Sequence, residues 1–336
     1  MSVDATFWRD RRVLVTGATG LLGGWLVREL VSRDADVVAL VRDRVSPSPL
    51  DDPAVRHRVT EVSGEAQDLE LMVRVVNEYA IETVFHLAAQ TIVGTALRDP
   101  ISTYVSNVQG TWCVLDACRR AGTVGRIVIA STDKVYGNQP TLPYLEDAPL
   151  LGRHPYDVSK ACADLIAQSY AATYALPVVV TRFGNLFGGG DLNWDRVIPG
   201  TIRAALRGVT PIIRSDGTPV RDYVFVRNAV DAYLRLAQQA HRPELRGRVY
   251  NFSENRPMSV VDICRKTLEA AGRPDLEIVI EGNARHEIQD QWLDSTRARQ
   301  ELEWTPRHSL EAGLTETVKW YDAYFRTGVG TAEVAL

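Results

Sequence analysis

Residues 12–23 read RVLVTGATGLLG, and this stretch decides the fold. Residues 12–16 are a β-branched run typical of a buried strand, and a helical pattern follows over about 22–33. Between the two lie Gly17, Gly20 and Gly23, spaced as G-x-x-G-x-x-G. Glycines in such a turn let backbone N–H groups and the start of the helix approach a pyrophosphate. A strand, this turn and a helix together predict a dinucleotide site.

The same alternation of short apolar runs and helical patterns continues through the first half of the chain. We expect further strands at 36–41, 83–87, 126–130 and 178–182, and helices at 109–121 and 156–174. Past residue 187 the alternation decays. The pattern predicts an α/β protein with a Rossmann-type doubly wound parallel sheet in residues 1–187. Residues 188–336 are expected to form a smaller, mainly substrate-binding lobe, with some elements returning to the first domain.

Composition and charge exclude several classes of protein. The 336 residues carry 38 Lys and Arg against 42 Asp and Glu, and a net charge of −4 offers no basic field for nucleic acid. The four cysteines lack C-x-x-C spacing, so neither a disulfide framework nor a metal site is expected. We see no leader sequence and no run of about 18 apolar residues, and therefore expect a cytoplasmic protein without membrane contact.

The ends of two strands offer candidate ligand contacts. At the end of the second strand, an acidic side chain favours NAD through the adenosine ribose, whereas an arginine favours the 2′-phosphate of NADP. The chain places Arg42 and Asp43 there, and both can also simply be solvated; we favour Asp43 and NAD. The strand at 83–87 ends in small residues, and Gln90 follows at the edge where open sheets bind ligands. His86 is interpreted as a core histidine.

A tyrosine and a lysine four residues apart begin the helix expected at 156–174. On a helix Tyr156 and Lys160 share a face, and an ammonium beside a phenol lowers the pKa of the phenol. Such a tyrosine can take a hydroxyl proton while the carbon gives hydride to a nicotinamide. Ordinary surface helices carry such pairs too, but Thr132, Asp133 and Lys134 follow the strand at 126–130. Thr132 can share the substrate proton with Tyr156. Asp133 and Lys134 supply an acid and an amine; the alternative is that they form an exposed charged pair without a catalytic role.

Four segments stand in the order typical of one known family. They are GATGLLG at 17–23, HLAAQ at 86–90, STDKVYG at 131–137 and YDVSK at 156–160. Together with Asn185 in RFGNLFGGGD, they resemble the extended short-chain dehydrogenase/reductase family that acts on nucleotide sugars. The resemblance covers residues 7–324, and within the family the chain is similar to CDP-glucose 4,6-dehydratases.

The resemblance implies two sets of contacts. Glu65 and Ala66 stand where relatives carry an aspartate and a hydrophobic residue against adenine, and arginine forks suit a diphosphate. The implied cofactor contacts are Gly17, Thr19, Gly20, Leu21, Leu22, Gly23, Arg42, Asp43, Glu65, Ala66, Leu87, Ala88, Ala89, Gln90, Asn107, Tyr156 and Lys160. The implied substrate contacts are Gln90, Thr132, Asp133, Tyr136, Asn185, Arg196, Val197 and Arg221.

The resemblance also implies a mechanism. Tyr156 would take the C4 hydroxyl proton while NAD+ takes a hydride from C4, and the resulting ketone acidifies the C5 proton. Water then leaves across C5 and C6, and hydride returns to C6 to give the 4-keto-6-deoxy sugar. Asp133 would protonate the leaving hydroxyl. Lys134, which stands where dTDP-glucose relatives carry a glutamate, would take the C5 proton once desolvation makes its amine neutral.

Two other functions compete with this reading. A nucleotide-sugar 4-epimerase needs Tyr156, Lys160 and NAD but no elimination acid, and an NAD-sensing protein would keep the fold without turnover. The nucleotide base and the sugar are not fixed by the sequence. We also expect a homodimer through the helices at 109–121 and 156–174, because both carry apolar residues on more than one face and relatives pair them.

Overall fold

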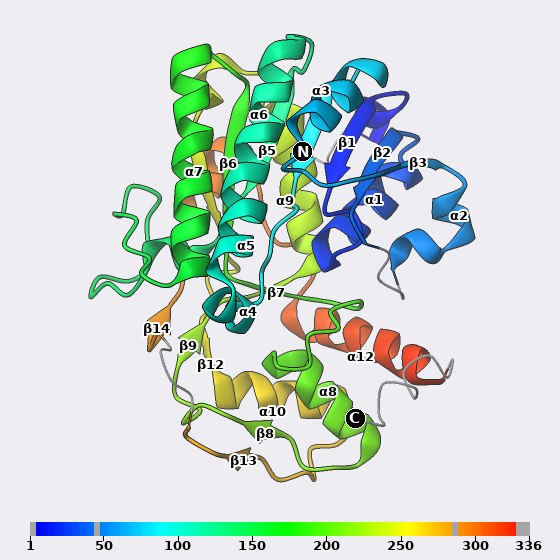
Figure 1. The fold of residues 1–336 in the computed structure, drawn as a ribbon. Coiled ribbons are helices and arrows are strands. Elements are labelled where there is room, and N and C mark those ends of the chain that lie inside the picture. The colour runs from blue at the N-terminus through cyan, green and yellow to red at the C-terminus, as the bar shows by residue number, and fades with distance from the viewer. Residues whose placement is uncertain (1–4, 44–47, 284–287, 327–336) are drawn as a thin grey trace.

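Seven parallel strands form the central sheet, in the order β11-β6-β5-β4-β1-β2-β3 (Figure 1). The computed structural model describes residues 5–43, 48–283 and 288–326. The strands are β1 (Arg12–Thr16), β2 (Asp36–Val41), β3 (Val59–Ser63), β4 (Thr83–His86), β5 (Arg126–Ala130), β6 (Val178–Phe183) and β11 (Val249–Phe252). The order steps outward from β1 in both directions, as a doubly wound sheet does.

Helices cover both faces of this sheet, as Figure 1 shows. On one face α1 (Leu21–Ser32) and α9 (Val226–Gln239) pack on a core that includes Leu26, Leu30 and Leu234. On the other, α3 (Leu69–Glu78), α6 (Gly110–Ala121) and α7 (Pro155–Tyr174) enclose a second core with Val114 and Ala167. The Rossmann-type α/β fold predicted from the sequence is confirmed.

Two strands of the sheet were not expected from the sequence. The edge strand β3 reads VTEVS and is only partly buried, so its pattern lacks the continuous apolar run of the inner strands. The other, β11, comes from the second half of the chain and pairs with β6 at the opposite edge. The helices at 109–121 and 156–174 begin one residue away from their predicted starts.

The remaining elements connect the strands or gather below the sheet in Figure 1. The connecting helices are α2 (Pro53–Arg56), α4 (Val93–Arg98), α5 (Pro100–Tyr104) and α11 (Thr296–Leu302). Below the sheet, α8 (Val197–Arg207), α10 (Val260–Ala270) and α12 (Leu310–Arg326) share a third core. The short strand pairs are β7 (Asn185–Phe187) with β10 (Tyr223–Phe225), and β8 (Ile212–Ile213) with β13 (Val279–Ile280). A three-stranded group places β9 (Val220–Arg221) between β12 (Met258–Ser259) and β14 (Asp290–Gln291).

Of the helices in the described ranges, none has the length and apolarity needed to cross a membrane.

Candidate functional site

A cavity of about 580 Å³ lies at the carboxyl ends of β1, β4 and β5, and we call it the sheet cavity. The cofactor contacts implied by the sequence meet on its wall, with the exception of Gln90 and Asn107. Those present are Gly17, Thr19, Gly20, Leu21, Leu22, Gly23, Arg42, Asp43, Glu65, Ala66, Leu87, Ala88, Ala89, Tyr156 and Lys160. The topology explains the gathering, because the carboxyl ends of parallel strands meet at one edge of the sheet.

The glycine turn between β1 and α1 leaves no room for side chains. Gly17 has φ +74°, and a Cβ there would lie 2.7 Å from the backbone nitrogen of Ala88. A Cβ on Gly23 would lie 2.0 Å from the carbonyl oxygen of Gly17. Gly20 caps α1 without a side-chain hydrogen bond, so the first N–H groups of the helix stand at the cavity wall without a cap. This turn suits a pyrophosphate.

One further observation shows that the sheet cavity fits a polar ligand. The hydroxyl of Ser131, at the end of β5, is buried on the cavity wall and has no hydrogen-bond partner among the described residues. A buried hydroxyl without a partner costs free energy, and a ribose or amide group placed in the cavity would satisfy it.

His86 supports the cavity from inside the core. Its ring lies between the hydroxyl oxygens of Thr16, at 2.8 Å, and Thr111, at 3.2 Å. Burial lowers the pKa of His86 to about 3, so the ring is neutral at physiological pH. The Thr16 hydroxyl also accepts from the backbone N–H of Ala88 at 3.2 Å. Through the Thr16 hydroxyl, His86 therefore helps to hold the chain that follows β4 on the cavity wall. This agrees with its interpretation as a core histidine.

Arg42 and Asp43 pair with each other at the far end of the sheet cavity. The Arg42 Nε lies 2.6 Å from the Asp43 Oδ2, and both side chains are exposed. A ribose hydroxyl that bound Asp43 would therefore have to displace or share Arg42, and a 2′-phosphate that bound Arg42 would have to displace or share Asp43. The pair by itself does not choose between NAD and NADP.

Four of the expected catalytic residues are buried together beside the sheet cavity. They are Thr132, Asp133, Tyr156 and Lys160. The hydroxyl of Thr132 donates to the Asp133 Oδ1 at 3.0 Å, and Asp133 opens the short 3-10 helix η4 (Asp133–Tyr136). Burial raises the pKa of Asp133, against the opposing effect of Lys134. A raised pKa favours the protonated form of the carboxyl group, which suits a proton donor.

The expectation for the phenol of Tyr156 needs a correction. Burial raises the pKa of Tyr156 to about 12, whereas the sequence predicted a lowered value. The Nζ of Lys160 donates to the carbonyl oxygen of Ala130 at 2.5 Å, and burial lowers the pKa of Lys160 itself to about 8. The influences that favour the tyrosinate come instead from Arg196 and from a hydrogen bond with Thr132.

Three further residues expected at the site lie behind its wall instead. The Gln90 side chain bonds to the Ile92 backbone and to Thr103, because it folds back on its own loop. Asn107 is buried and bonds to the Gln90 backbone and to the Ser159 hydroxyl.

Tyr136 is fully buried, and its hydroxyl donates to Asn251 at 2.7 Å and accepts from Arg182 at 2.7 Å. These hydrogen bonds within the protein leave the Tyr136 hydroxyl without a role on either cavity wall. The expected contacts of Gln90, Asn107 and Tyr136 are therefore indirect: the three residues support the site.

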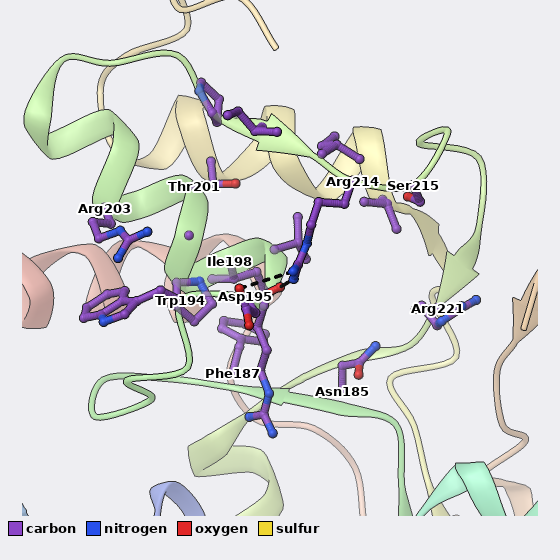
Figure 2. Close-up of a pocket in the computed structure, with 18 of the residues that line it drawn as sticks. Asn185, Phe187, Trp194, Asp195, Ile198, Thr201, Arg203, Arg214, Ser215 and Arg221 are labelled. Carbon is purple, nitrogen blue, oxygen red and sulfur yellow. Dashed lines mark hydrogen bonds and ion pairs between the residues drawn. The ribbon is translucent and has the colours of Figure 1, made fainter. Parts of the chain in front are cut away.

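A second cavity of about 760 Å³ adjoins the first, and we call it the lobe cavity. Figure 2 shows this cavity, with Asn185 and Arg221 on the side near β7 and β9. The expected substrate contacts Asn185, Arg196, Val197 and Arg221 all line it. Lys134, Asn185 and Arg196 line both cavities, so a ligand can extend from one into the other.

The two expected diphosphate arginines are both held by protein groups. The Arg196 Nη1 lies 2.8 Å from the Asp191 Oδ2. Arg221 donates to the carbonyl oxygens of Val220 and Gln289, at 2.8 and 2.9 Å, and also to that of Ile288. Carbonyl acceptors orient a guanidinium without neutralising its charge, so the two arginines differ: Arg196 has a carboxylate partner and Arg221 has only carbonyl partners among these bonds.

The lobe cavity also contains residues that the sequence did not single out. Arg214 bonds to the Asp195 backbone at 2.9 Å and pairs with its carboxylate at 3.3 Å, as the dashed lines in Figure 2 indicate. Arg203 lies over the Trp194 ring, 5.0 Å from its centroid. Lone arginines and tryptophans carry no spacing signal, so these residues could be found only once the fold brought α8 and β8 together. The residues that the structure describes contain no His, Cys, Asp and Glu grouping suited to a metal ion.

Comparison with known proteins gives a consistent result. Residues 14–317 match a family model described as GDP-mannose 4,6 dehydratase. The CDP-glucose 4,6-dehydratase of Salmonella typhimurium is 31% identical over 96% of this chain and 94% of its own length. A dTDP-glucose 4,6-dehydratase of Bacillus anthracis in complex with NAD has a TM-score of 0.82 at 28% identity, over 93% of this chain and 97% of that one.

The neighbours in structure also include an epimerase. The UDP-glucose 4-epimerase of Thermotoga maritima with UDP-glucose has a TM-score of 0.84 at 27% identity, over 94% of this chain and 99% of that one. The fold is thus shared by two activities. From the match over residues 14–317 and the identity to the Salmonella enzyme, the chain belongs to the GDP-mannose 4,6-dehydratase family, within the extended short-chain dehydrogenases/reductases that its motifs resemble.

Proposed function

We propose that this protein is an NAD-dependent nucleotide-sugar 4,6-dehydratase that converts CDP-glucose to its 4-keto-6-deoxy product. The observation that carries the proposal is that a buried acid, Asp133, and the adjacent amine, Lys134, line the sheet cavity together with Tyr156, while Lys134 also lines the lobe cavity. Oxidation at C4 alone needs neither of them, whereas elimination of water needs a proton donor and a base. The choice of CDP-glucose is supported by the relative from Salmonella.

The sheet cavity would hold the NAD. The uncapped start of α1 would bind the pyrophosphate, Asp43 would accept from the adenosine ribose, and Ser131 offers a free hydroxyl deeper in the cavity. Bound NAD+ supplies the hydride acceptor for C4 and the hydride donor for C6. A dTDP-glucose 4,6-dehydratase of similar fold was crystallised with NAD, which supports this choice.

The residues of the chain would move the protons. Tyr156 takes the C4 hydroxyl proton, and the hydrogen bond with Thr132 and the charge of Arg196 oppose the effect of burial on the phenol. Asp133, whose pKa is raised by burial, holds a proton for the departing C6 hydroxyl. Lys134 lines both cavities; it would take the C5 proton during elimination and return a proton to C5 when C6 is reduced.

The lobe cavity would hold the nucleotide end of the substrate. Arg196 lines both cavities and Arg221 lines the lobe cavity, so the two suit a diphosphate that lies across the junction. Asn185 on β7 lines both cavities and can contact the sugar side of the diphosphate. We also propose the functional division at residue 187 expected from the sequence, with NAD bound before it and nucleotide sugar bound mainly after it.

The deciding experiment compares the wild type with Asp133→Asn on a panel of nucleotide sugars. We expect the wild type to remove water from CDP-glucose, read as product mass, and to place deuterium at C5 in D₂O. Asp133→Asn should still oxidise C4 but lose elimination by about 10²–10⁴-fold, so reduced nicotinamide accumulates and is seen by absorbance.

The matched control is Asp147→Asn, whose carboxylate is exposed outside both cavities and should leave the rates unchanged. If the wild type interconverts C4 epimers without losing water, and Asp133→Asn keeps that rate, the protein is an epimerase. Stoichiometric NAD binding without consumption of any nucleotide sugar would instead favour an NAD sensor.

We further propose that the protein is a cytoplasmic homodimer. The adjacent helices α6 and α7 expose large apolar side chains on their outer faces, with Trp112 41% and Leu165 55% exposed. Such a pair of apolar faces is typical of an interface between two copies. All four cysteines are free thiols in the structure, which suits a reducing compartment.

A further inference from the structure

A glutamine outside every motif contacts both members of the acid and amine pair. Gln291 lies on β14 and is fully buried. Its Nε2 donates to the backbone carbonyl of Asp133 at 2.8 Å, and its Oε1 accepts from the Lys134 Nζ at 3.5 Å. One side-chain amide thus bridges the two neighbouring residues, 157 and 158 positions earlier in the sequence.

The orientation of this amide follows from its partners. A backbone carbonyl can only accept, so the Nε2 of Gln291 must face Asp133. The Oε1 then faces Lys134, and a carbonyl oxygen can accept a hydrogen bond from either an ammonium or a neutral amine. The amide therefore holds Lys134 in place without favouring one protonation state as strongly as a carboxylate would.

The backbone around Gln291 is fixed on both sides. Gln291 and Arg221 are paired residues of β14 and β9, so the amide and the expected diphosphate arginine share one short ladder. Beyond the strand, the N–H of Leu293 donates to the Asp222 carboxylate at 2.7 Å, and the carbonyl of Trp292 accepts from Tyr144 at 2.9 Å. The amide can therefore hold Lys134 more firmly than a side chain on an open loop.

We propose that Gln291 is a positioning residue that holds the Lys134 amine at the junction of the two cavities for removal of the C5 proton. This inference deepens the proposed dehydratase function and rests on it. Gln291 lines neither cavity, so it acts through Lys134 and not on the sugar. Its amide is neutral, whereas a carboxylate at the same place would put a negative charge beside the amine.

Several charged and titratable groups lie near Lys134. They come from the η4 turn, the start of α7, β9 and the residue before α8: Asp133, His154, Tyr156, Asp157, Arg196 and Arg221. Asp133 and Asp157 already supply two carboxyl groups with pKa values raised by burial. A third carboxyl at position 291 would add negative charge where the native neighbour is a neutral amide.

The test uses two substitutions of Gln291 in the full enzyme with NAD and CDP-glucose. Gln291→Glu keeps the shape and an acceptor for Lys134, adds a charge and loses the donor to the Asp133 carbonyl, whereas Gln291→Met keeps the length and removes both hydrogen bonds. The matched control is Gln289→Glu, two residues away, because the Gln289 side chain is exposed and bonds to Thr218. The readouts are C4 oxidation as reduced nicotinamide in a single turnover, C5 deuterium incorporation in D₂O, KM, and kcat from pH 6 to about 10.

We expect both variants to oxidise C4 within about threefold of wild type with KM little changed, while C5 exchange near pH 7 falls by about 10²-fold or more. In Gln291→Glu the acid limb of the kcat profile should move upward by about one pH unit or more, and C5 exchange should recover toward the wild-type rate at high pH. Gln291→Met should not recover in this way. Gln289→Glu should match the wild type.

Two results would overturn the inference. One is wild-type C5 exchange and an unchanged pH profile in both variants. The other is a parallel loss of C4 oxidation and C5 exchange, or failure to fold, because Gln291 would then support the structure as a whole. Failure of the proposed function looks different: the wild type itself would show neither loss of water nor C5 exchange, before any variant is compared.

Discussion

Lys160 illustrates how little space the site leaves around a reacting group. Its side chain is buried, and the Nζ donates to the Ala130 carbonyl at 2.5 Å on the wall of the sheet cavity. Lys160→Arg keeps a positive charge but replaces a compact ammonium by a larger planar fork. We expect C4 oxidation to fall by about 10²-fold or more with the near-UV circular dichroism unchanged. Lys319→Arg, at an exposed position of α12, is the matched control, and near-normal turnover in Lys160→Arg would show that the fork is tolerated.

His86 gives the folded protein a specific sensitivity to acid. Burial, followed by the charge of Lys160, lowers the pKa of His86 from 6.5 to about 3. Between these pH values the unfolded chain binds a proton that the folded chain does not, so stability is lost as the pH falls below about 6.5. The loss approaches about 1.4 kcal/mol per pH unit. Above pH 6.5 His86 causes no such loss.

The measurement compares wild type and His86→Gln by urea unfolding at pH 8 and pH 5. Burial raises the pKa of Asp222 to about 7, so this carboxyl group increases the stability of the folded protein on acidification. The increase is the same in wild type and variant and cancels in the comparison. Relative to the variant, the wild type should lose about 2 kcal/mol of unfolding free energy between the two pH values. An equal difference at both pH values would mean that His86 is protonated in the folded state.

At the scale of elements, a buried ion pair joins β6 to α7. The Arg182 Nε lies 2.9 Å from one carboxylate oxygen of Asp164 and the Nη2 3.0 Å from the other, with both side chains out of solvent. Asp164→Asn removes one charge and leaves the guanidinium buried without a counterion. We expect the unfolding free energy to fall by about 3–5 kcal/mol, measured by urea unfolding.

The control for that prediction is an exposed pair on another helix. Asp322 pairs with Arg326 at 2.8 Å on the surface of α12, where solvent screens the charges. Asp322→Asn should change the unfolding free energy by less than about 1 kcal/mol. Similar losses in both variants would mean that the Arg182 charge finds another partner, for which the Tyr136 hydroxyl and the Glu146 carbonyl are the nearest candidates.

The elements also show which parts of the site are visible in the sequence. The inner strands and the glycine turn could be predicted, because each is a local pattern of burial or backbone conformation that its own residues specify. The role of Gln291 could not, since β14 has two residues and acquires its neighbours only by pairing with β9. The raised pKa of Tyr156 was missed for a related reason: the spacing to Lys160 is local, whereas burial and the carbonyl of Ala130 come from the folded sheet.

At the scale of the whole molecule, we expect two copies to associate through α6 and α7. Leu165→Asp on α7 places a charge on the exposed apolar face and should convert a dimer to a monomer, measured as mass by light scattering at micromolar concentration. Ile280→Asp on β13 is the matched control, because Ile280 is similarly exposed but lies far from these helices in Figure 1. A wild-type protein of monomer mass would contradict the prediction.

Because β11 lies far after β6 in the sequence, the sheet is incomplete during part of synthesis. On the ribosome, β6 is synthesised well before β11, and at about 5–20 residues per second the delay between them is several seconds. Throughout that interval the emerging sheet has an unpaired edge at β6, where strands of neighbouring nascent chains can add. A gene cut after residue 187 would make this state permanent, so its product should aggregate instead of folding as an independent nucleotide-binding domain. The edge of β6 is covered only when residues 249–252 have emerged and paired with it as β11.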